Sequence, residues 1–130
     1  MTMSTSILLL THNGIGDSLA TAAKRLMPSS STRIGIYAVS YDCVPEEEVI
    51  KLKQYCAELD QGSGVLLLTD LYGATPSNIA MQFKGEANRW LVGGLNLSML
   101  LKVLNYSHLE GEALAQKAYE GGRDSVIRPW

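Results

Sequence analysis

Uninterrupted runs of apolar residues alternate along the chain with segments in which apolar residues recur every three or four positions. Two of the runs are nearly identical: residues 7–11 precede His12, and residues 65–69 precede Asp70. A run of this length, followed by glycine and then by a helical pattern, is typical of a strand buried on both faces of a parallel sheet. Each of these two predicted strands therefore ends at an ionisable residue.

The same pattern predicts the remaining elements. Residues 33–40 and 90–93 form two more apolar runs of strand length, and a helical spacing of apolar residues follows each predicted strand. Pro45 suits a first helical position, while Thr75 and Asn96 suit the position that caps a helix N-terminus. The expected helices cover residues 16–27, 45–59, 76–83, 97–104 and 109–119.

Alternating strands and helices predict an α/β fold with a doubly wound, mainly parallel sheet, strand order 2-1-3-4, and helices on both faces. A length of 130 residues fits one domain spanning residues 1–130. Gly121 and Gly122 predict the end of the last helix. Residues 125–128 then predict a short strand, which either pairs at the sheet edge or reaches a neighbouring subunit.

Composition narrows the classes of function. The chain carries 11 Lys and Arg against 13 Asp and Glu, and the basic residues are scattered, which argues against nucleic-acid binding. Every apolar run is far shorter than the roughly 18 residues of a membrane span. Residues 1–5 contain no basic region of a signal peptide, so we expect a cytosolic protein. Cys43 and Cys56 lack zinc-ligand spacing, and no metal is expected.

His12 and Asp70 suit each other chemically. Ligands of open α/β sheets bind at the carboxyl edge, chiefly between the first and third strands, where these two residues are expected to meet. A neutral imidazole is nucleophilic and can carry a phosphoryl group. A carboxylate that accepts a hydrogen bond from Nδ1 would leave Nε2 as the attacking atom. The alternative at this point is that both residues merely satisfy the backbone of two unrelated loops.

The residues after Asp70 favour an anion site. Gly73, Ala74 and Thr75 form a loop of small residues that leads into a helix N-terminus, where backbone N–H groups and the helix dipole favour negative charge. Thr75 either caps this helix or offers its hydroxyl to a phosphoryl oxygen. Gly14 and Gly16 open the first helix in a similar way. Phosphoryl transfer depends mainly on positioning and charge stabilisation, which such donors supply.

Three motifs stand at the ends of successive predicted strands. They are Thr11-His12, residues 69–76 with the sequence TDLYGATP, and residues 94–100 with the sequence GLNLSML. Together they resemble the mannose-family EIIA domain of the bacterial phosphoenolpyruvate-dependent phosphotransferase system, and the similarity spans essentially the whole chain. In the third motif, Ser98 occupies the place where the family usually has proline.

The resemblance implies that His12 accepts a phosphoryl group from the phosphocarrier HPr and passes it to an EIIB component, while Asp70 orients the ring. It also implies that Thr75 contacts the phosphoryl group, in a loop where Ala74 replaces the family's usual second glycine. Family members are homodimers in which a C-terminal strand can pair with the partner's sheet, so residues 125–128 are candidates for exchange. Transfer between two histidines needs no metal, nucleotide or other cofactor.

Other interpretations remain open. Gly14 and Gly16 match two glycines of a dinucleotide-binding fingerprint, and Asp42 follows the second strand, although Leu19 stands where the third glycine belongs. The phosphotransfer subunit that serves dihydroxyacetone kinase shares the expected fold and a strand-end histidine, but residues 72–76 fit the sugar-system branch better. A purely regulatory role, in which phosphorylation of His12 is itself the signal, is a third alternative.

Overall fold

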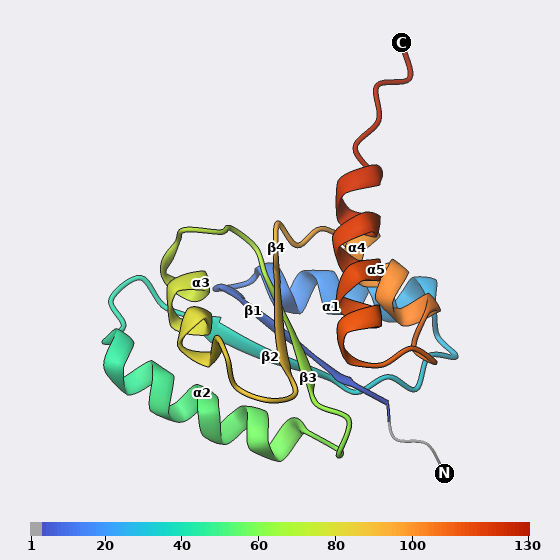
Figure 1. The fold of residues 1–130 in the computed structure, drawn as a ribbon. Coiled ribbons are helices and arrows are strands. Elements are labelled where there is room, and N and C mark those ends of the chain that lie inside the picture. The colour runs from blue at the N-terminus through green and yellow to red at the C-terminus, as the bar shows by residue number, and fades with distance from the viewer. Residues whose placement is uncertain (1–3) are drawn as a thin grey trace.

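The computed structural model describes residues 4–130, which form a parallel sheet with helices packed on both faces (Figure 1). Residues 1–3, part of the N-terminal segment predicted to lack a signal peptide, lie outside the described residues. In chain order the elements are β1 (Ser6–His12), α1 (Ile15–Leu26), β2 (Ile34–Val39), α2 (Pro45–Leu59), β3 (Val65–Thr69), α3 (Thr75–Ala80), the 3₁₀ turn η1 (Met81–Phe83), β4 (Arg89–Gly93), α4 (Leu97–Asn105) and α5 (Gly111–Asp124).

The strands pair in the order β2-β1-β3-β4, and all the pairings are parallel, which confirms the predicted sheet. In the middle of β1, Leu9 lies beside Ile36 of β2 and Leu68 of β3. β1 and β3 are buried almost throughout because both faces of these central strands are covered. β4 lies at one edge of the sheet and is only half-buried along its length.

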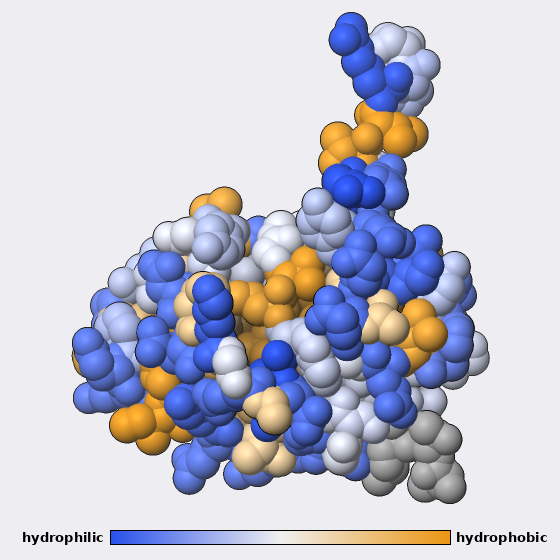
Figure 2. All heavy atoms as spheres, in the orientation of Figure 1, coloured by the Kyte–Doolittle hydropathy of each residue, from blue (hydrophilic) through white to orange (hydrophobic). Residues whose placement is uncertain are grey.

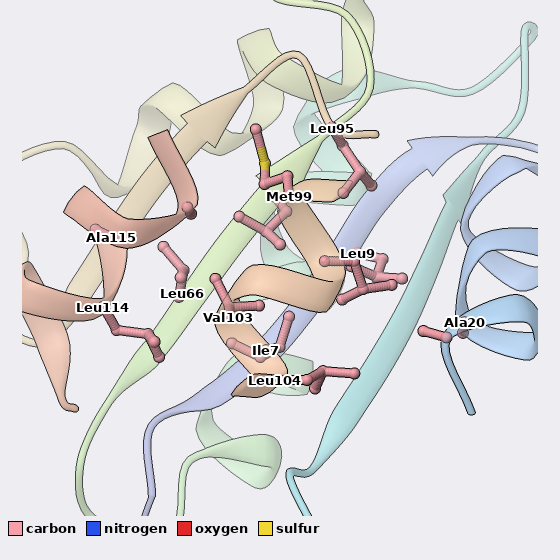
Figure 3. Close-up of a cluster of buried hydrophobic side chains, with 14 residues drawn as sticks. Ile7, Leu9, Ala20, Leu66, Leu95, Met99, Val103, Leu104, Leu114 and Ala115 are labelled. Carbon is pink, nitrogen blue, oxygen red and sulfur yellow. The ribbon is translucent and has the colours of Figure 1, made fainter. Parts of the chain in front are cut away.

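The hydrophobic core has two halves, one on each face of the sheet, because successive side chains of a strand point to opposite faces. Ile7 and Leu9 of β1 point into the first half, where α1, α4 and α5 pack (Figure 3). Leu8 and Leu10 point into the second half, which α2, α3 and η1 cover. Among the residues that the structure describes, no helix is both long and apolar enough to cross a bilayer.

The last helix is longer than predicted and contains both glycines that were expected to end it. α5 continues to Asp124. A Cβ on Gly122 would lie 2.6 Å from Cε of Met99, and a Cβ on Gly121 would lie 2.6 Å from Cβ of Lys102. The prediction was wrong because these glycines do not end the helix; they allow α5 to pack closely against α4.

The C-terminal residues also differ from the expectation. Residues 126–130 form neither helix nor strand, and they run away from the body of the molecule (Figure 1). Val126 and Ile127 are therefore 80% and 74% exposed. The expected strand at 125–128 does not pair with the sheet of its own chain, because α5 carries the chain outward to Asp124 before the tail begins. Pairing with a neighbouring subunit stays a prediction.

Candidate functional site

His12 is the last residue of β1, and a buried threonine fixes the turn that follows it. The Oγ1 of Thr11 donates a hydrogen bond to the carbonyl oxygen of His12 at 2.8 Å and accepts one from the amide of Gly16 at 3.0 Å. Gly14 takes the left-handed conformation, with φ of 87°, which favours glycine. The start of α1 is therefore held directly against the strand end that carries the histidine.

The structure brings together His12 and Asp70, as the sequence predicted. The Nδ1 of His12 lies 2.8 Å from Oδ2 of Asp70, and the amide of His12 donates to the same oxygen at 3.1 Å. The other carboxylate oxygen accepts a hydrogen bond from the amide of Leu71 at 3.0 Å. The carboxylate is thus fixed by the backbone as well as by the imidazole ring.

The charge on Asp70 determines which ring nitrogen of His12 is free. Burial by itself raises the pKa of Asp70, but the hydrogen bonds from the ring and the amide of His12 outweigh it, and the pKa lies below its ordinary value. An ionised carboxylate only accepts hydrogen bonds, so Nδ1 carries the hydrogen. Nε2 keeps its lone pair, and the His12 side chain is 20% exposed. The arrangement therefore leaves Nε2, on a partly exposed side chain, as the ring nitrogen that is not bound by Asp70.

The loop after β3 is held in shape by Ser77. The amide of Gly73 donates to Oγ of Ser77 at 2.7 Å, and this hydroxyl donates to the carbonyl oxygen of Ala74 at 3.0 Å. The amide of Ala74 donates to the carbonyl oxygen of Leu71 at 3.3 Å. In this conformation the amide hydrogens of Gly73 and Ala74 are engaged inside the loop, and their participation in phosphoryl binding stays a prediction.

Thr75 does not cap α3, contrary to one of the two roles that the sequence left open. The cap position is held by Ala74, and Thr75 is the first helical residue. Its hydroxyl is exposed and has no hydrogen-bond partner within residues 4–130. Ala74 adopts an extended conformation, with φ of −85°, and the left-handed conformation falls to Gly73, with φ of 90°. The loop therefore accommodates alanine at this position without strain.

The third motif, residues 94–100, also lies at this edge of the sheet. The side chain of Asn96 caps α4, because its Oδ1 accepts a hydrogen bond from the amide of Met99 at 2.8 Å, as predicted. The amide of Leu95 donates to the carbonyl oxygen of Thr69 at 2.9 Å. This bond ties the loop after β4 to the end of β3, directly beside Asp70.

Tyr41 also contacts His12, and this contact was not predicted from the sequence. The two ring centroids are 5.6 Å apart, and the ring planes are inclined at 31°. Tyr41 follows β2, and the last residue of β2, Val39, pairs with His12. The predicted strand order placed the second strand beside the first, so an aromatic residue just after the second strand was the available signal.

The fold and the paired side chains define a class of protein: an α/β domain that presents an oriented imidazole at the carboxyl edge of a parallel sheet. The sequence matches the model of the EIIA-man family, the PTS system fructose IIA component, over residues 6–118. The chain belongs to this family and is a mannose-type IIA component of the sugar phosphotransferase system. Family membership implies phosphotransferase activity in the broad sense. Among curated proteins, none matches the sequence.

Solved structures confirm the fold. The mannose/sorbose-specific IIA subunit from Enterococcus faecalis superposes with a TM-score of 0.83 at 24% identity, covering 97% of this chain and 95% of its own. The IIA protein of the fucose utilisation operon from Streptococcus pneumoniae has a TM-score of 0.80 at 20% identity, with coverages of 97% and 96%. An EIIA component from Streptococcus agalactiae has a TM-score of 0.80 at 18% identity, with coverages of 95% and 96%.

Proposed function

We propose that His12 accepts a phosphoryl group from phospho-HPr and passes it to an EIIB component. The observation that supports this most directly is the 2.8 Å contact between Nδ1 of His12 and Asp70, which leaves Nε2 available. In the transfer, the lone pair of Nε2 attacks phosphorus. The bond from phosphorus to the donor imidazole breaks, and its electron pair returns to that ring. No metal or nucleotide takes part in this exchange.

Asp70 has an electrostatic role in this proposal. When phosphorus bonds to Nε2 while Nδ1 keeps its hydrogen, the imidazole ring becomes positively charged. The carboxylate is already in place 2.8 Å away, and its side chain is only 9% exposed, so water screens the attraction weakly. A preorganised charge of this kind stabilises the transition state without rearrangement during the reaction.

We propose that Thr75, the first residue of α3, donates a hydrogen bond to a phosphoryl oxygen. Its hydroxyl is exposed and has no hydrogen-bond partner among the described residues. The loop is instead held by the hydrogen bonds of the Ser77 hydroxyl. Gly73 and Ala74 provide the backbone conformation that carries Thr75 to the start of α3. On this basis we propose that the Thr75 hydroxyl binds the phosphoryl group and that Gly73 and Ala74 shape the loop that presents it.

The protein partners are proposed to dock around His12. Four large apolar side chains at this edge are exposed: Ile15 at 41%, Val44 at 48%, Leu71 at 61% and Tyr72 at 68%. They lie after β1, β2 and β3, whose carboxyl ends meet at the edge that carries the histidine. Exposed apolar groups around a reactive residue suit a transient protein contact. Because HPr and EIIB would approach the same nitrogen, they would use this surface in turn.

The test of the acceptor is the intact mass after incubation with phosphoenolpyruvate, Enzyme I and HPr. The wild type should gain one acid-labile phosphoryl group, and His12→Ala should gain none. The sequence contains two histidines, so His108→Ala is the matched control. His108 is exposed in the segment between α4 and α5 and should leave the gain unchanged. An adduct on His12→Ala, or none on the wild type while HPr is phosphorylated, would overturn the proposal.

The onward acceptor is tested with the purified phosphoprotein. Loss of the phosphoryl group to an EIIB component is expected in a sugar-transport chain. Transfer to the nucleotide-bearing subunit of dihydroxyacetone kinase instead would move the protein to that branch. Retention of the group with every EIIB component of the cell would contradict onward transfer and favour a regulatory phosphoacceptor.

We further propose a homodimer in which the C-terminal residues of each chain pair with β4 of its partner. No strand within residues 4–130 pairs with the outer edge of β4, and a groove of about 680 Å³ runs beside it. Apolar side chains such as Phe83, Trp90 and Leu91 line this groove, and Figure 2 shows exposed apolar atoms along it. The tail carries the exposed apolar residues Val126 and Ile127, which suit an added strand.

A pair of truncations tests the exchange. A chain that ends at Ser125 keeps the whole of α5 but lacks the tail, and it should sediment as a monomer. A chain that ends at Arg128 lacks only the last two residues and should remain a dimer, because the predicted strand covers 125–128. The exchange would be contradicted if both truncated chains were dimers, or if the wild type were a monomer.

A further inference from the structure

The contact between Tyr41 and His12 is not explained by the stability of the fold. Tyr41 is 89% exposed and therefore adds little to the hydrophobic core. Its ring nevertheless lies against the imidazole, with 5.6 Å between the centroids and 31° between the planes. An exposed aromatic side chain in contact with the one side chain that the mechanism makes reactive calls for a functional explanation.

The two neighbours of the imidazole act on it differently. Asp70 binds the ring at Nδ1 through its carboxylate. Tyr41 contacts it ring to ring, with the two ring planes inclined at 31°. An aromatic face attracts a cation whose centre lies within about 6 Å of the ring centroid. The imidazole lies within that distance.

We propose that Tyr41 is a positioning residue that stabilises the phosphorylated form of His12. This inference rests on the proposed function, since the ring gains its positive charge when phosphorus bonds to Nε2 and Nδ1 keeps its hydrogen. The π-face of Tyr41 then attracts the charged ring, and the same contact restricts the orientations of that ring. The phenol hydroxyl has no part in this attraction, so phenylalanine should replace tyrosine.

The spontaneous loss of the phosphoryl group should report this effect. In hydrolysis, the oxygen of water bonds to phosphorus, the bond between phosphorus and Nε2 breaks, and its electron pair returns to Nε2. Inorganic phosphate leaves and the ring becomes neutral, so the positive charge declines as the bond breaks. A group that stabilises the charged ring therefore slows hydrolysis. For an exposed aromatic face, the expected slowing is roughly two- to fivefold.

Three variants separate the π-face from the other properties of the side chain. Tyr41→Phe removes only the hydroxyl, and Tyr41→Leu keeps an apolar side chain but removes the aromatic ring. Ile50→Ala is the control for loss of an exposed apolar side chain, because Ile50 is 68% exposed on α2 and belongs to no part of the site. Each phosphoprotein is freed from HPr and Enzyme I, and the phosphorylated fraction is followed by intact mass over time.

The rates of loss should fall into two groups. Tyr41→Phe and Ile50→Ala should lose the group at the wild-type rate, and Tyr41→Leu should lose it roughly two to five times faster. Equal rates for Tyr41→Leu and the wild type would overturn the inference. So would an equally fast loss from Tyr41→Phe, because the hydroxyl rather than the π-face would then be responsible.

A second measurement needs no phosphorylation. In nuclear magnetic resonance spectra of the unmodified protein, the ring current of Tyr41 should displace the carbon-bound ring protons of His12. Tyr41→Leu should abolish the displacement and Tyr41→Phe should keep it; no change in Tyr41→Leu would overturn the contact itself. Failure of the wild type to become phosphorylated at His12 would instead overturn the proposed function, and this inference with it.

Discussion

β1 and β3 end in nearly the same sequence, yet the two strand ends are built differently. At the end of β1, the buried hydroxyl of Thr11 joins the carbonyl oxygen of His12 to the amide of Gly16, so the strand turns at once into α1. At the end of β3, the hydroxyl of Thr69 is buried and has no hydrogen-bond partner among residues 4–130. The loop that follows β3 is instead held by Ser77.

The difference shows how two similar strands acquire complementary tasks. Leu10 pairs with Thr69, so β1 extends two residues past its last position paired with β3 and presents His12. Asp70 follows Thr69 directly and reaches both the amide and the ring of His12. The tight turn after β1 presents His12, the proposed nucleophile, and the longer loop after β3 supplies Asp70, the group proposed to orient it.

Asp70→Asn is expected to have the largest effect, on the rate at which the protein accepts the phosphoryl group. The variant keeps the shape of the side chain but loses the charge that attracts the phosphorylated imidazole. Acceptance of the phosphoryl group from HPr should slow by roughly tenfold to hundredfold, the worth of a hydrogen bond to a charged group. Rapid-quench kinetics at neutral pH measure the rate, and circular dichroism checks that the fold is kept. An unchanged rate would remove Asp70 from the mechanism.

A matched pair of substitutions should separate the two threonines. Thr11→Val leaves the buried amide of Gly16 without an acceptor and should lower the free energy of unfolding by about 1–3 kcal/mol. Thr69→Val removes a buried hydroxyl that has no partner among the described residues, so it should leave stability unchanged or raise it by up to about 1 kcal/mol. Urea denaturation measures both variants. If both variants lost the same free energy of unfolding, the two threonine hydroxyls would contribute equally to stability, contrary to this prediction.

The smallest effect is expected in the pH dependence of the free energy of unfolding. Because the pKa of Asp70 is lower in the folded chain than its unfolded value near 3.9, its ionised form stabilises the fold above that value, and this contribution is lost as the pH falls through the folded pKa. Asp70→Asn does not titrate. The stability advantage of the wild type over Asp70→Asn should therefore shrink from about pH 5 towards pH 2. A constant difference in urea denaturation over this range would contradict a lowered pKa for Asp70 in the folded chain.

The sheet and the pairing of His12 with Asp70 were predictable from the sequence for a physical reason. Strands buried on both faces must be apolar throughout, and residues 7–11 and 65–69 have that composition. Parallel strands end at one edge of the sheet, so His12 and Asp70 had to lie on the same side. The motifs after the strands indicated the family, which the family match over residues 6–118 confirms.

The features that sequence did not reveal depend on contacts between distant elements. Gly121 and Gly122 resemble a helix end, and only the proximity of α4 shows that they are packing residues. Thr75 and Ser77 are both hydroxyl residues near a helix start, and the chain folds so that Ser77 binds the loop. The contact of Tyr41 with His12 depends on the path of the β2–α2 loop, which no local pattern specifies.

The hydrogen bonds of Ser77 have a consequence for how often the site can be used. They hold residues 73 and 74 through groups of the chain itself, so the shape of the loop does not depend on a bound anion. The entropy of ordering this loop is therefore lost once, during folding, and not again at each encounter with a partner. In the proposed function, the protein receives and releases the same phosphoryl group many times. A loop that is already ordered adds no ordering cost to either step.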